Sequence, residues 1–452
     1  MRGRRRTTWR RSGRPAGAGA RATVVTAVLC ALAALPGGIA AGSAQGTYGF
    51  APDARPVTGA TGTTDAPRLE PGRTYRSTLP KNGKLYYRLD LAATTTAYVP
   101  VTAVPPAHAT VSSTDGIRVS FQDARGTSCS NASARFGAAL SARPVTALGE
   151  REAGRTLCQG AGTYYLLVER LDTAGSDGSE NSGTADPAQR WDLELKPATE
   201  PGLAGTGPTD APRTWDSASP EAVAGDPRDR TGGTGFAQAR PLDQGVWRTG
   251  ISPGQTLFYK VPLDWGRQVR AVAELGSSTS GHGYVGGALN LALYNPVRGY
   301  VDDAPLGYTG TQKSAALDPL PPVEYANRYA VLTRDNAMRF AGAYYLVVHL
   351  SEQMAGTFGP GPFGVTLRVR VDGQAHGGPA YAGRSVPDGV FAVTEQDRRA
   401  AATGSTGGGD TAMKALAAGG IGAGTALLLV LGGWTVAARR AQTRVSAQKP
   451  TA

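Results

Sequence analysis

The chain has 452 residues, of which 47 are basic and 35 acidic, and its formal net charge is +12. Thirteen of the basic residues lie in segments 1–44 and 414–452, where no acidic residue occurs, so the body between these flanks is nearly neutral. This distribution excludes a basic nucleic-acid-binding face on the folded body. Hydrophobic residues make up 40%, which suffices for packed cores but is too little for a polytopic membrane protein.

The N-terminal segment has the parts of an export signal. An arginine-rich stretch precedes an apolar run at 22–35, and small residues follow at 42–44. We therefore predict a signal peptide over 1–44, with cleavage after Ala44. The alternative is an uncleaved anchor, for which the apolar run is short.

The central part of the chain carries the same pattern twice. The run YRSTLPKNGKLYYRLDL at 75–91 returns as WRTGISPGQTLFYKVPL at 247–263. Three further blocks recur in the same order: GIRVSFQD with ALNLALYN, AGTYYLLVERL with AGAYYLVVHL, and WDLELK with FGVTLRV. These matches indicate an internal duplication in which loop lengths differ and the order of the blocks is kept.

Apolar residues alternate with polar residues inside each block. The predicted core-facing positions are Leu85, Tyr87, Leu89 and Leu91 with Leu257, Tyr259, Val261 and Leu263; Ile117, Val119 and Phe121 with Leu289, Leu291 and Leu293; and Tyr164, Leu166 and Val168 with Tyr344, Leu346 and Val348. A period of two is typical of half-buried strands. We predict an all-β body of two tandem antiparallel β-sandwich domains, jelly-roll-like, with polar outer faces.

The cysteines favour an exported protein with one disulfide. Cys30 lies inside the export signal, which leaves Cys129 and Cys158 as an even pair. We predict a disulfide between them that closes the long loop of the first copy. A two-cysteine metal site is the alternative, although neither a histidine nor another cysteine lies nearby. The corresponding loop of the second copy instead carries four tyrosines: Tyr300, Tyr308, Tyr325 and Tyr329.

The C-terminal part contains a candidate membrane anchor. Residues 415–437 carry no charge and are long enough to cross a bilayer, and Arg439 and Arg440 follow at once. We expect these segments in chain order: signal peptide 1–44, linker 45–67, first β-sandwich 68–199, linker 200–238, second β-sandwich 239–372, flexible stalk 373–414, transmembrane helix 415–437 and basic cytoplasmic tail 438–452. The body would then lie outside the cell membrane.

Each copy resembles a bacterial pre-peptidase C-terminal (PPC-type) domain. In the second copy, FAQARPLDQGVWRTGISPGQTLFYKVPL is similar to the opening of that family, LNLALYNPVRG to its central strand and turn, and GAYYLVV to a later strand. The resemblance implies a jelly-roll-like sandwich that serves as a non-catalytic accessory module. The peptidase domain that usually accompanies such modules has no counterpart among the predicted segments.

Candidate catalytic residues are weakly supported by their context. Gly250-Ile251-Ser252-Pro253-Gly254 matches G-x-S-x-G, but a nucleophile elbow needs a helix after the serine, and here a strand follows. The first copy has Pro80 in place of Ser252 and Glu169 in place of His349, which we place on the outward side of a strand. The other histidines look like loop residues: His108, His282 and His376. We predict no catalytic residue.

Candidate ligand-binding residues also have simpler explanations. Asp302-Asp303, Asp226 and Asp229 are possible calcium ligands or solvated turn acids. Tyr165 and Tyr345 are either a carbohydrate platform or ordinary surface tyrosines. We predict no metal and no cofactor.

The sequence as a whole suggests a non-enzymatic, single-pass cell-surface protein of a high-GC bacterium, an actinobacterium by composition. Its two sandwiches would serve binding or envelope assembly, with another envelope protein or a cell-wall polymer as partner and no nucleic acid. The first alternative is an accessory subunit of a membrane-anchored or secreted hydrolase, and the second is a hydrolase with a non-standard site. Specific ligand contacts are expected in the long loops where the copies differ.

Overall fold

The computed structural model describes residues 47–172, 190–218 and 223–404, which all belong to one compact unit. The predicted signal peptide, the transmembrane segment 415–437 and the tail lie outside the described residues. Within the described ranges, no helix has the length and apolar character needed to cross a membrane.

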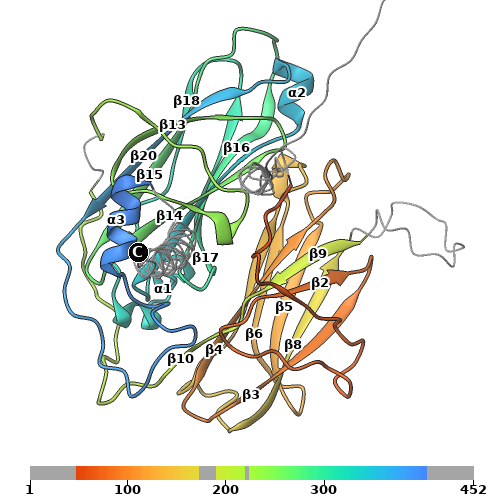
Figure 1. Ribbon diagram of the computed structural model, residues 1–452, viewed down its shortest axis with the longest axis vertical. Coiled ribbons are helices and arrows are strands. Elements are labelled where there is room, and N and C mark those ends of the chain that lie inside the picture. The colour runs from red at the N-terminus through yellow and green to blue at the C-terminus, as the bar shows by residue number, and fades with distance from the viewer. Residues whose placement is uncertain (1–46, 173–189, 219–222, 405–452) are drawn as a thin grey trace, which may run out of the picture. The chain divides into compact units, whose positions relative to one another are not determined.

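The first copy forms two facing sheets, drawn in red to yellow in Figure 1. One sheet has the strand order β1 (Arg55–Pro56), β2 (Tyr75–Leu79), β9 (Trp191–Leu195), β4 (Thr96–Val104) and β10 (Ala198–Glu200), and β7 (Val145–Arg151) also pairs with β4. The other has the order β3 (Lys84–Leu91), β8 (Gly162–Leu171), β5 (Gly116–Asp123) and β6 (Ser128–Arg135).

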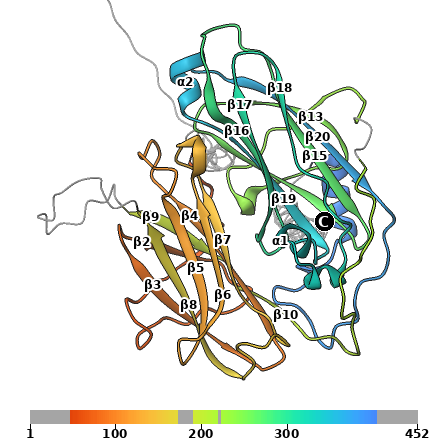
Figure 2. The same ribbon diagram turned by 180° about the vertical axis from the view of Figure 1, so that it is seen from behind.

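The second copy, in green to blue, also forms two sheets (Figure 2). One has the order β11 (Arg228–Asp229), β13 (Gly245–Ile251), β20 (Phe363–Asp372), β15 (Gln268–Leu275) and β18 (Lys313–Ala316). The other has the order β12 (Arg240–Pro241), β14 (Thr256–Leu263), β19 (Gly342–Leu350), β16 (Val285–Tyr294) and β17 (Tyr300–Tyr308). Short helices lie between or after the strands: α1 (Thr333–Asn336), α2 (Gln353–Phe358) and α3 (Glu395–Thr403).

The duplication read from the sequence is also a duplication of topology. The path β2-β9-β4-β7 of the first copy corresponds to β13-β20-β15-β18 of the second, and β3-β8-β5-β6 corresponds to β14-β19-β16-β17. Except for the short β1, β11 and β12, the strands pair in antiparallel fashion. The prediction of an all-β body with two sandwiches is confirmed.

Each sandwich has its own hydrophobic core, built from the alternating residues. Tyr87 on β3 and Tyr259 on β14 occupy equivalent positions and are 0% and 2% exposed. All the residues predicted to face a core are buried in one of two separate clusters. Period-two patterning therefore identified the inner faces of both sandwiches correctly.

The predicted disulfide between Cys129 and Cys158 is present, with an S–S distance of 2.01 Å. It joins β6 to the loop that precedes β8. The fully buried guanidinium of Arg151 holds the same loop, donating hydrogen bonds to the carbonyl oxygens of Cys158 at 2.8 Å and Gln159 at 2.9 Å.

The predicted polar outer face is wrong for one sheet of the second sandwich. On β19, the outward residues Tyr345, Val347 and His349 are only 9%, 8% and 2% exposed. His349 contacts Ser141 of the first sandwich, and the other two belong to a cluster that includes Tyr48. The outward face of this sheet is buried because the first sandwich and the segments 45–67 and 200–238 pack against it.

The segments expected to be linkers differ from that expectation as well. Tyr48, Phe236 and Phe391 lie in the three segments 45–67, 200–238 and 373–414, and each is at most 5% exposed. The described part of the expected stalk, residues 373–404, lies against the second sandwich: Arg398 on α3 pairs with Asp264 at 3.0 Å. The composition of these segments predicts flexible linkers. Instead, one aromatic residue of each segment packs into a hydrophobic cluster with residues from distant parts of the chain.

Candidate functional site

Two apolar clusters join the sandwiches. The first contains Tyr48, Phe236, Phe258, Tyr345 and Val347. The second contains Tyr98, Ala198, Val297, Phe340 and Phe391. In the second cluster, Tyr98 and Ala198 of the first copy pack on residues of the second; in the first cluster, Tyr48 from the segment before the first copy and the partly buried Val104 of β4 do so. The outer faces of β14-β19-β16 and of β4 are therefore both covered at the junction.

A buried ion pair lies beside the first cluster. Glu194 on β9 accepts a hydrogen bond from Arg298 Nη1 at 2.5 Å, and the two side chains are 0% and 2% exposed. Glu194 also accepts from the Tyr48 hydroxyl at 3.1 Å and from the backbone N–H of Ala51 at 2.8 Å. The guanidinium lies 4.6 Å from the ring of Phe236. Such complete pairing is what makes a buried carboxylate tolerable.

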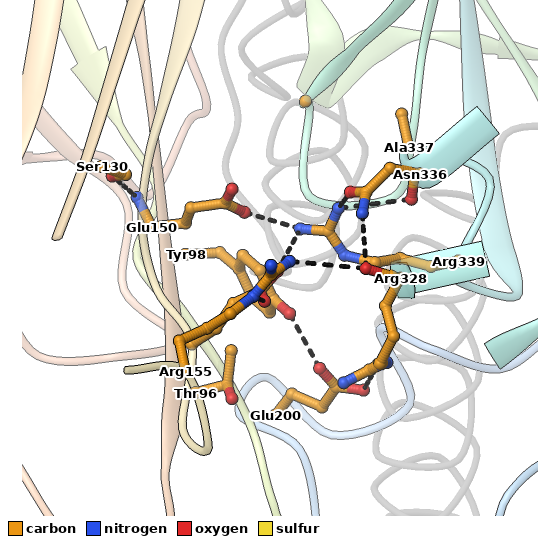
Figure 3. Close-up of polar contacts among 12 residues, drawn as sticks. Thr96, Tyr98, Ser130, Glu150, Arg155, Glu200, Arg328, Asn336, Ala337 and Arg339 are labelled. Atoms are coloured by element: carbon orange, nitrogen blue, oxygen red, sulfur yellow. Dashed lines mark hydrogen bonds and ion pairs between the residues drawn. The ribbon is translucent and has the colours of Figure 1, made fainter. Parts of the chain in front are cut away.

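Two further carboxylates of the first sandwich are paired with arginines of the second (Figure 3). Glu200 accepts hydrogen bonds from the hydroxyls of Tyr98 and Tyr381 and from Arg328, each at 2.8 Å. Glu150 on β7 accepts from Arg339 Nη2 at 2.6 Å. Burial by itself would lower the pKa of Arg339, but Glu150 and its neighbours outweigh burial and the pKa is raised.

A polar cleft of about 530 Å³ opens beside the Glu150–Arg339 pair. Its walls come from β6, β7 and the residues before β7 in the first sandwich, and from β16, β17 and α1 in the second. Arg143, Asn290, Tyr294, Tyr300 and Asp303 are among the lining residues. This volume falls within the range of small-ligand sites, and because both sandwiches contribute to its walls, their docking forms the cleft.

Arg143 is the cationic group at the centre of this region. It lines the polar cleft and also a neighbouring cleft of about 690 Å³. Its Nη1 donates a long hydrogen bond of 3.5 Å to the carbonyl oxygen of Ser141. Burial lowers the pKa of Arg143, while Tyr294 and Asp303 act in the opposite direction. The side chain therefore lies within electrostatic reach of both residues without forming an ion pair with Asp303.

The neighbouring cleft is more apolar and is bridged by a contact between a histidine and a glutamate. Phe50, Val104 and Pro105 line it, and His108 of the first copy contacts Glu352 of the second. Because both partners of this bridge are exposed on the cleft rim, the contact adds little to stability.

A serine lies beside a histidine where the sandwiches meet. His349 Nε2 is 3.0 Å from Ser141 Oγ, and His349 Nδ1 is 2.9 Å from Thr256 Oγ1. Ser141 Oγ also accepts a hydrogen bond from the backbone N–H of Glu352 at 3.1 Å. A catalytic pair needs a reachable hydroxyl and a carboxylate that orients the histidine. Here Ser141 is 1% exposed and a threonine hydroxyl takes the orienting position, so the arrangement is suited to packing.

The histidine is held in its neutral form by this environment. Burial lowers the pKa of His349 well below its usual range, and the nearby Arg143 lowers it further. His349 lies on the outward side of its strand, as predicted, but the first sandwich covers that side, which alternation along β19 does not reveal.

The other predicted site residues do not come together. Ser252 lies in the turn between β13 and β14, where its backbone N–H donates to Gln255 Oε1 at 2.9 Å, so the turn interpretation of G-x-S-x-G is confirmed. Asp302 accepts from the backbone N–H of Asp318, and Asp229 pairs with Arg248. In the part of the chain that the structure describes, no group of three or more His, Cys, Asp or Glu residues could hold a metal ion.

Sequence reasoning did not identify Glu194, Arg298 and Arg143. Glu194 occupies an outward position between Leu193 and Leu195 and looks like an ordinary solvated charge. Of the two tyrosines considered as a carbohydrate platform, Tyr345 is instead buried between the sandwiches. No local signal distinguishes these residues, because the groups that cover them come from distant parts of the chain.

No known protein family matches the chain, and no curated protein matches it. The M60 catalytic domain with the CBM51-1 and CBM51-2 domains of Clostridium perfringens ZmpB is similar at 8% identity and a TM-score of 0.17, over 65% of this chain and 34% of that chain. This chain thus spans about a third of that protein's length.

Two further solved structures match more of their own length. The CUB1-EGF-CUB2 region of human MASP-1/3 matches at 9% identity and a TM-score of 0.14, over 66% of this chain and 99% of that chain. The CBM22-1-CBM22-2 tandem of Paenibacillus barcinonensis Xyn10C matches at 8% identity and a TM-score of 0.17, over 73% of this chain and 100% of that chain. TM-scores this low carry no argument about family or function.

Proposed function

We propose that this protein is a non-enzymatic cell-surface module whose two sandwiches act as one rigid body for binding or envelope assembly. The observation that carries the proposal is the mutual burial of the two outer sheet faces, with the Glu194–Arg298 pair enclosed between them. Because a buried ion pair tolerates little displacement of its partners, the sandwiches keep a constant relative position. The polar cleft beside them is then preformed.

The titratable groups at the junction support a binding role over a catalytic one. Glu194, Glu200 and Glu150 are each engaged by an arginine, and His349 is neutral and enclosed. Catalytic acids and bases need access to a substrate and a proton to transfer at working pH. The three carboxylates instead form ion pairs between the two sandwiches.

The location is part of the proposal and rests on the sequence. A signal peptide over 1–44 and a transmembrane helix over 415–437 would place the sandwiches outside the cell, attached to its membrane, with the basic tail in the cytoplasm. The partner would be another envelope protein or a cell-wall polymer. The resemblance to PPC-type modules agrees with an accessory role.

Two measurements on the full-length protein test this function. Affinity purification from membranes of the producing cell should recover a specific envelope protein or wall polymer, and a co-purified hydrolase would instead identify an accessory subunit. Incubation with a fluorophosphonate probe, which labels activated serines, should leave the protein unlabelled. Labelling that disappears in Ser141→Ala or Ser252→Ala would overturn the non-enzymatic assignment.

A further inference from the structure

The first-sandwich wall of the polar cleft presents a guanidinium with unused donors. Within the described residues, Arg143 donates one hydrogen bond, the long one to Ser141 O, while Glu150 on the same wall is paired with Arg339 of the second sandwich. A guanidinium carries five N–H donors in a fixed plane. Most of the donors of Arg143 thus have no partner in the described part of the chain and can serve a ligand in the cleft.

The second-sandwich wall presents acceptors. Asp303 on β17 is exposed and accepts a hydrogen bond from the hydroxyl of Tyr300, which leaves most of its acceptor sites open. Asn290 on β16 also lines the cleft, but its Oδ1 is enclosed and has no hydrogen-bond partner in the described part of the chain. A ligand in this cleft thus meets the guanidinium of Arg143 from the first sandwich and the carboxylate of Asp303 from the second.

Aromatic rings complete the second wall. Tyr300 is 46% exposed, and Tyr294 meets it edge-to-face at 6.2 Å between ring centres. Tyr294 is held in turn by an edge-to-face contact with Phe236 at 5.5 Å. Tyr300 therefore offers an exposed ring whose orientation is supported from behind, which is suited to a ligand with one apolar face.

These features select a class of ligand. Hydroxyl groups donate and accept hydrogen bonds at once, so a polyhydroxylated ring satisfies both walls, and its C–H face can lie on a tyrosine. Peptide recognition would instead need apolar pockets for anchoring side chains. The apolar part of this lining consists largely of small side chains: Ala132, Ala134, Ala147, Ala292 and Ala337. The cleft is therefore better matched to sugars than to a peptide.

We propose that the cleft binds a segment of a polysaccharide, with Arg143 donating to sugar oxygens, Asp303 accepting from sugar hydroxyls, and Tyr300 stacked on a ring. This inference rests on the proposed binding function, whose ligand class it names. The first sandwich supplies Arg143 and the second supplies Asp303 and Tyr300, so neither copy holds the complete site.

Calorimetric titration of the full-length protein tests this site. The protein is kept in a detergent without a sugar headgroup and titrated with chitohexaose, a neutral chain, and with hexagalacturonate, an acidic one. Saturable binding of at least one is expected, and the preferred chain tells a neutral polymer from an acidic one. Arg143→Gln should weaken binding about tenfold or more. Tyr300→Ala should weaken it strongly, and Tyr300→Phe, which keeps the ring, should weaken it less.

Matched variants outside the cleft provide the controls. Tyr284→Ala removes a tyrosine that is 67% exposed and Arg384→Gln removes an exposed arginine, and neither residue lines the cleft. Both should bind like the unmodified protein. Absence of binding to both hexasaccharides at millimolar concentration, or an equal loss of binding in cleft and control variants, would overturn the site.

A glycine-serine dodecapeptide that binds in an Arg143-dependent manner would show a peptide site instead. A protein partner recovered by affinity purification, without sugar binding, would contradict this inference alone.

Discussion

Glu194 in β9 and Arg298 in the turn after β16 form a 2.5 Å ion pair that connects the two copies of the duplicated unit and is almost fully removed from solvent. Arg298 has a positive φ of 56°, a conformation that non-glycine residues adopt infrequently. The pair thus combines an unusual backbone position with a fully coordinated carboxylate. It lies at the junction of the two sandwiches, which belong to one compact unit.

Glu194→Gln is expected to lower the free energy of unfolding by about 3–5 kcal/mol, because Arg298 would keep a buried charge without its counter-ion. Guanidinium chloride unfolding measures this change. Asp192→Asn is the matched control on the same strand, because it breaks the more exposed pair with Arg76. This control substitution should lower the free energy of unfolding by no more than about 1 kcal/mol. Equal losses in the two variants would contradict the special role of the buried pair.

Lys196, two residues from Glu194, is expected to reduce stability at neutral pH. Burial, together with Arg298, lowers its pKa to about 8, whereas the unfolded chain keeps the ordinary value. The unfolded state therefore holds an extra proton between about pH 8 and pH 10.5, and stability falls as the pH drops through that range. Lys196→Met should unfold at higher denaturant than the unmodified protein at pH 7. The difference should shrink at pH 10, and a constant difference would show that the charge is not its cause.

The Cys129–Cys158 disulfide is expected to stabilise the first sandwich by about 3–4 kcal/mol, given the sequence separation of 29 between the cysteines. The double variant Cys129→Ala/Cys158→Ala should unfold at lower denaturant, as should the reduced protein. Because Arg151 also holds the loop, the variant should remain folded in the absence of denaturant. Unchanged stability after reduction would mean that Arg151 alone suffices.

His349 is expected to make the junction sensitive to acid. Its pKa is lowered in the folded protein, so below the unfolded value of about 6.5 the unfolded state takes up a proton that the folded state does not. The free energy of unfolding therefore decreases as the pH drops below about 6.5, by up to about 1.4 kcal/mol per pH unit. Thr256, Ser141 and Arg143 surround the ring and offer no negative charge to compensate.

The pH dependence of His349→Gln isolates this contribution. His376, which pairs with Glu324, has a raised pKa and acts in the opposite direction, and it is unchanged in the variant. The unmodified protein should lose more stability than His349→Gln between pH 7.5 and pH 5.5. Parallel losses would show that protonation of His349 does not matter.

Phe391→Ala is expected to release residues 373–404 from the body. Phe391 stacks on Phe340 at 4.9 Å and meets Tyr98 edge-to-face at 6.2 Å. Removing a buried phenylalanine costs about 3–5 kcal/mol, and here the loss falls on the contacts of this segment. Limited proteolysis should cut the variant within 373–404 while both sandwiches resist. Cleavage of the unmodified protein at the same sites and rate would contradict the packing.

Much of the fold was predictable because its information is local. Alternation along Leu85–Leu91 and its counterpart on β14 identified the inner faces, because a strand places every second residue on one side. The disulfide followed from an even pair of cysteines. The candidate cleft was not predictable, because Arg143 and Asp303 lie 160 positions apart and become neighbours only when the sandwiches dock.

The sequence by itself determined the duplication, the strand faces that form each core and the cysteine pair. Only the tertiary structure decided that the outer faces of two sheets cover one another, that Glu194 and Arg298 are enclosed, and that His349 meets Ser141. The physical reason is that period-two patterning reports which side of a strand a residue occupies, while burial depends on what covers that side. For the second side of β19, the covering residues come from the other copy and from the segments outside both copies.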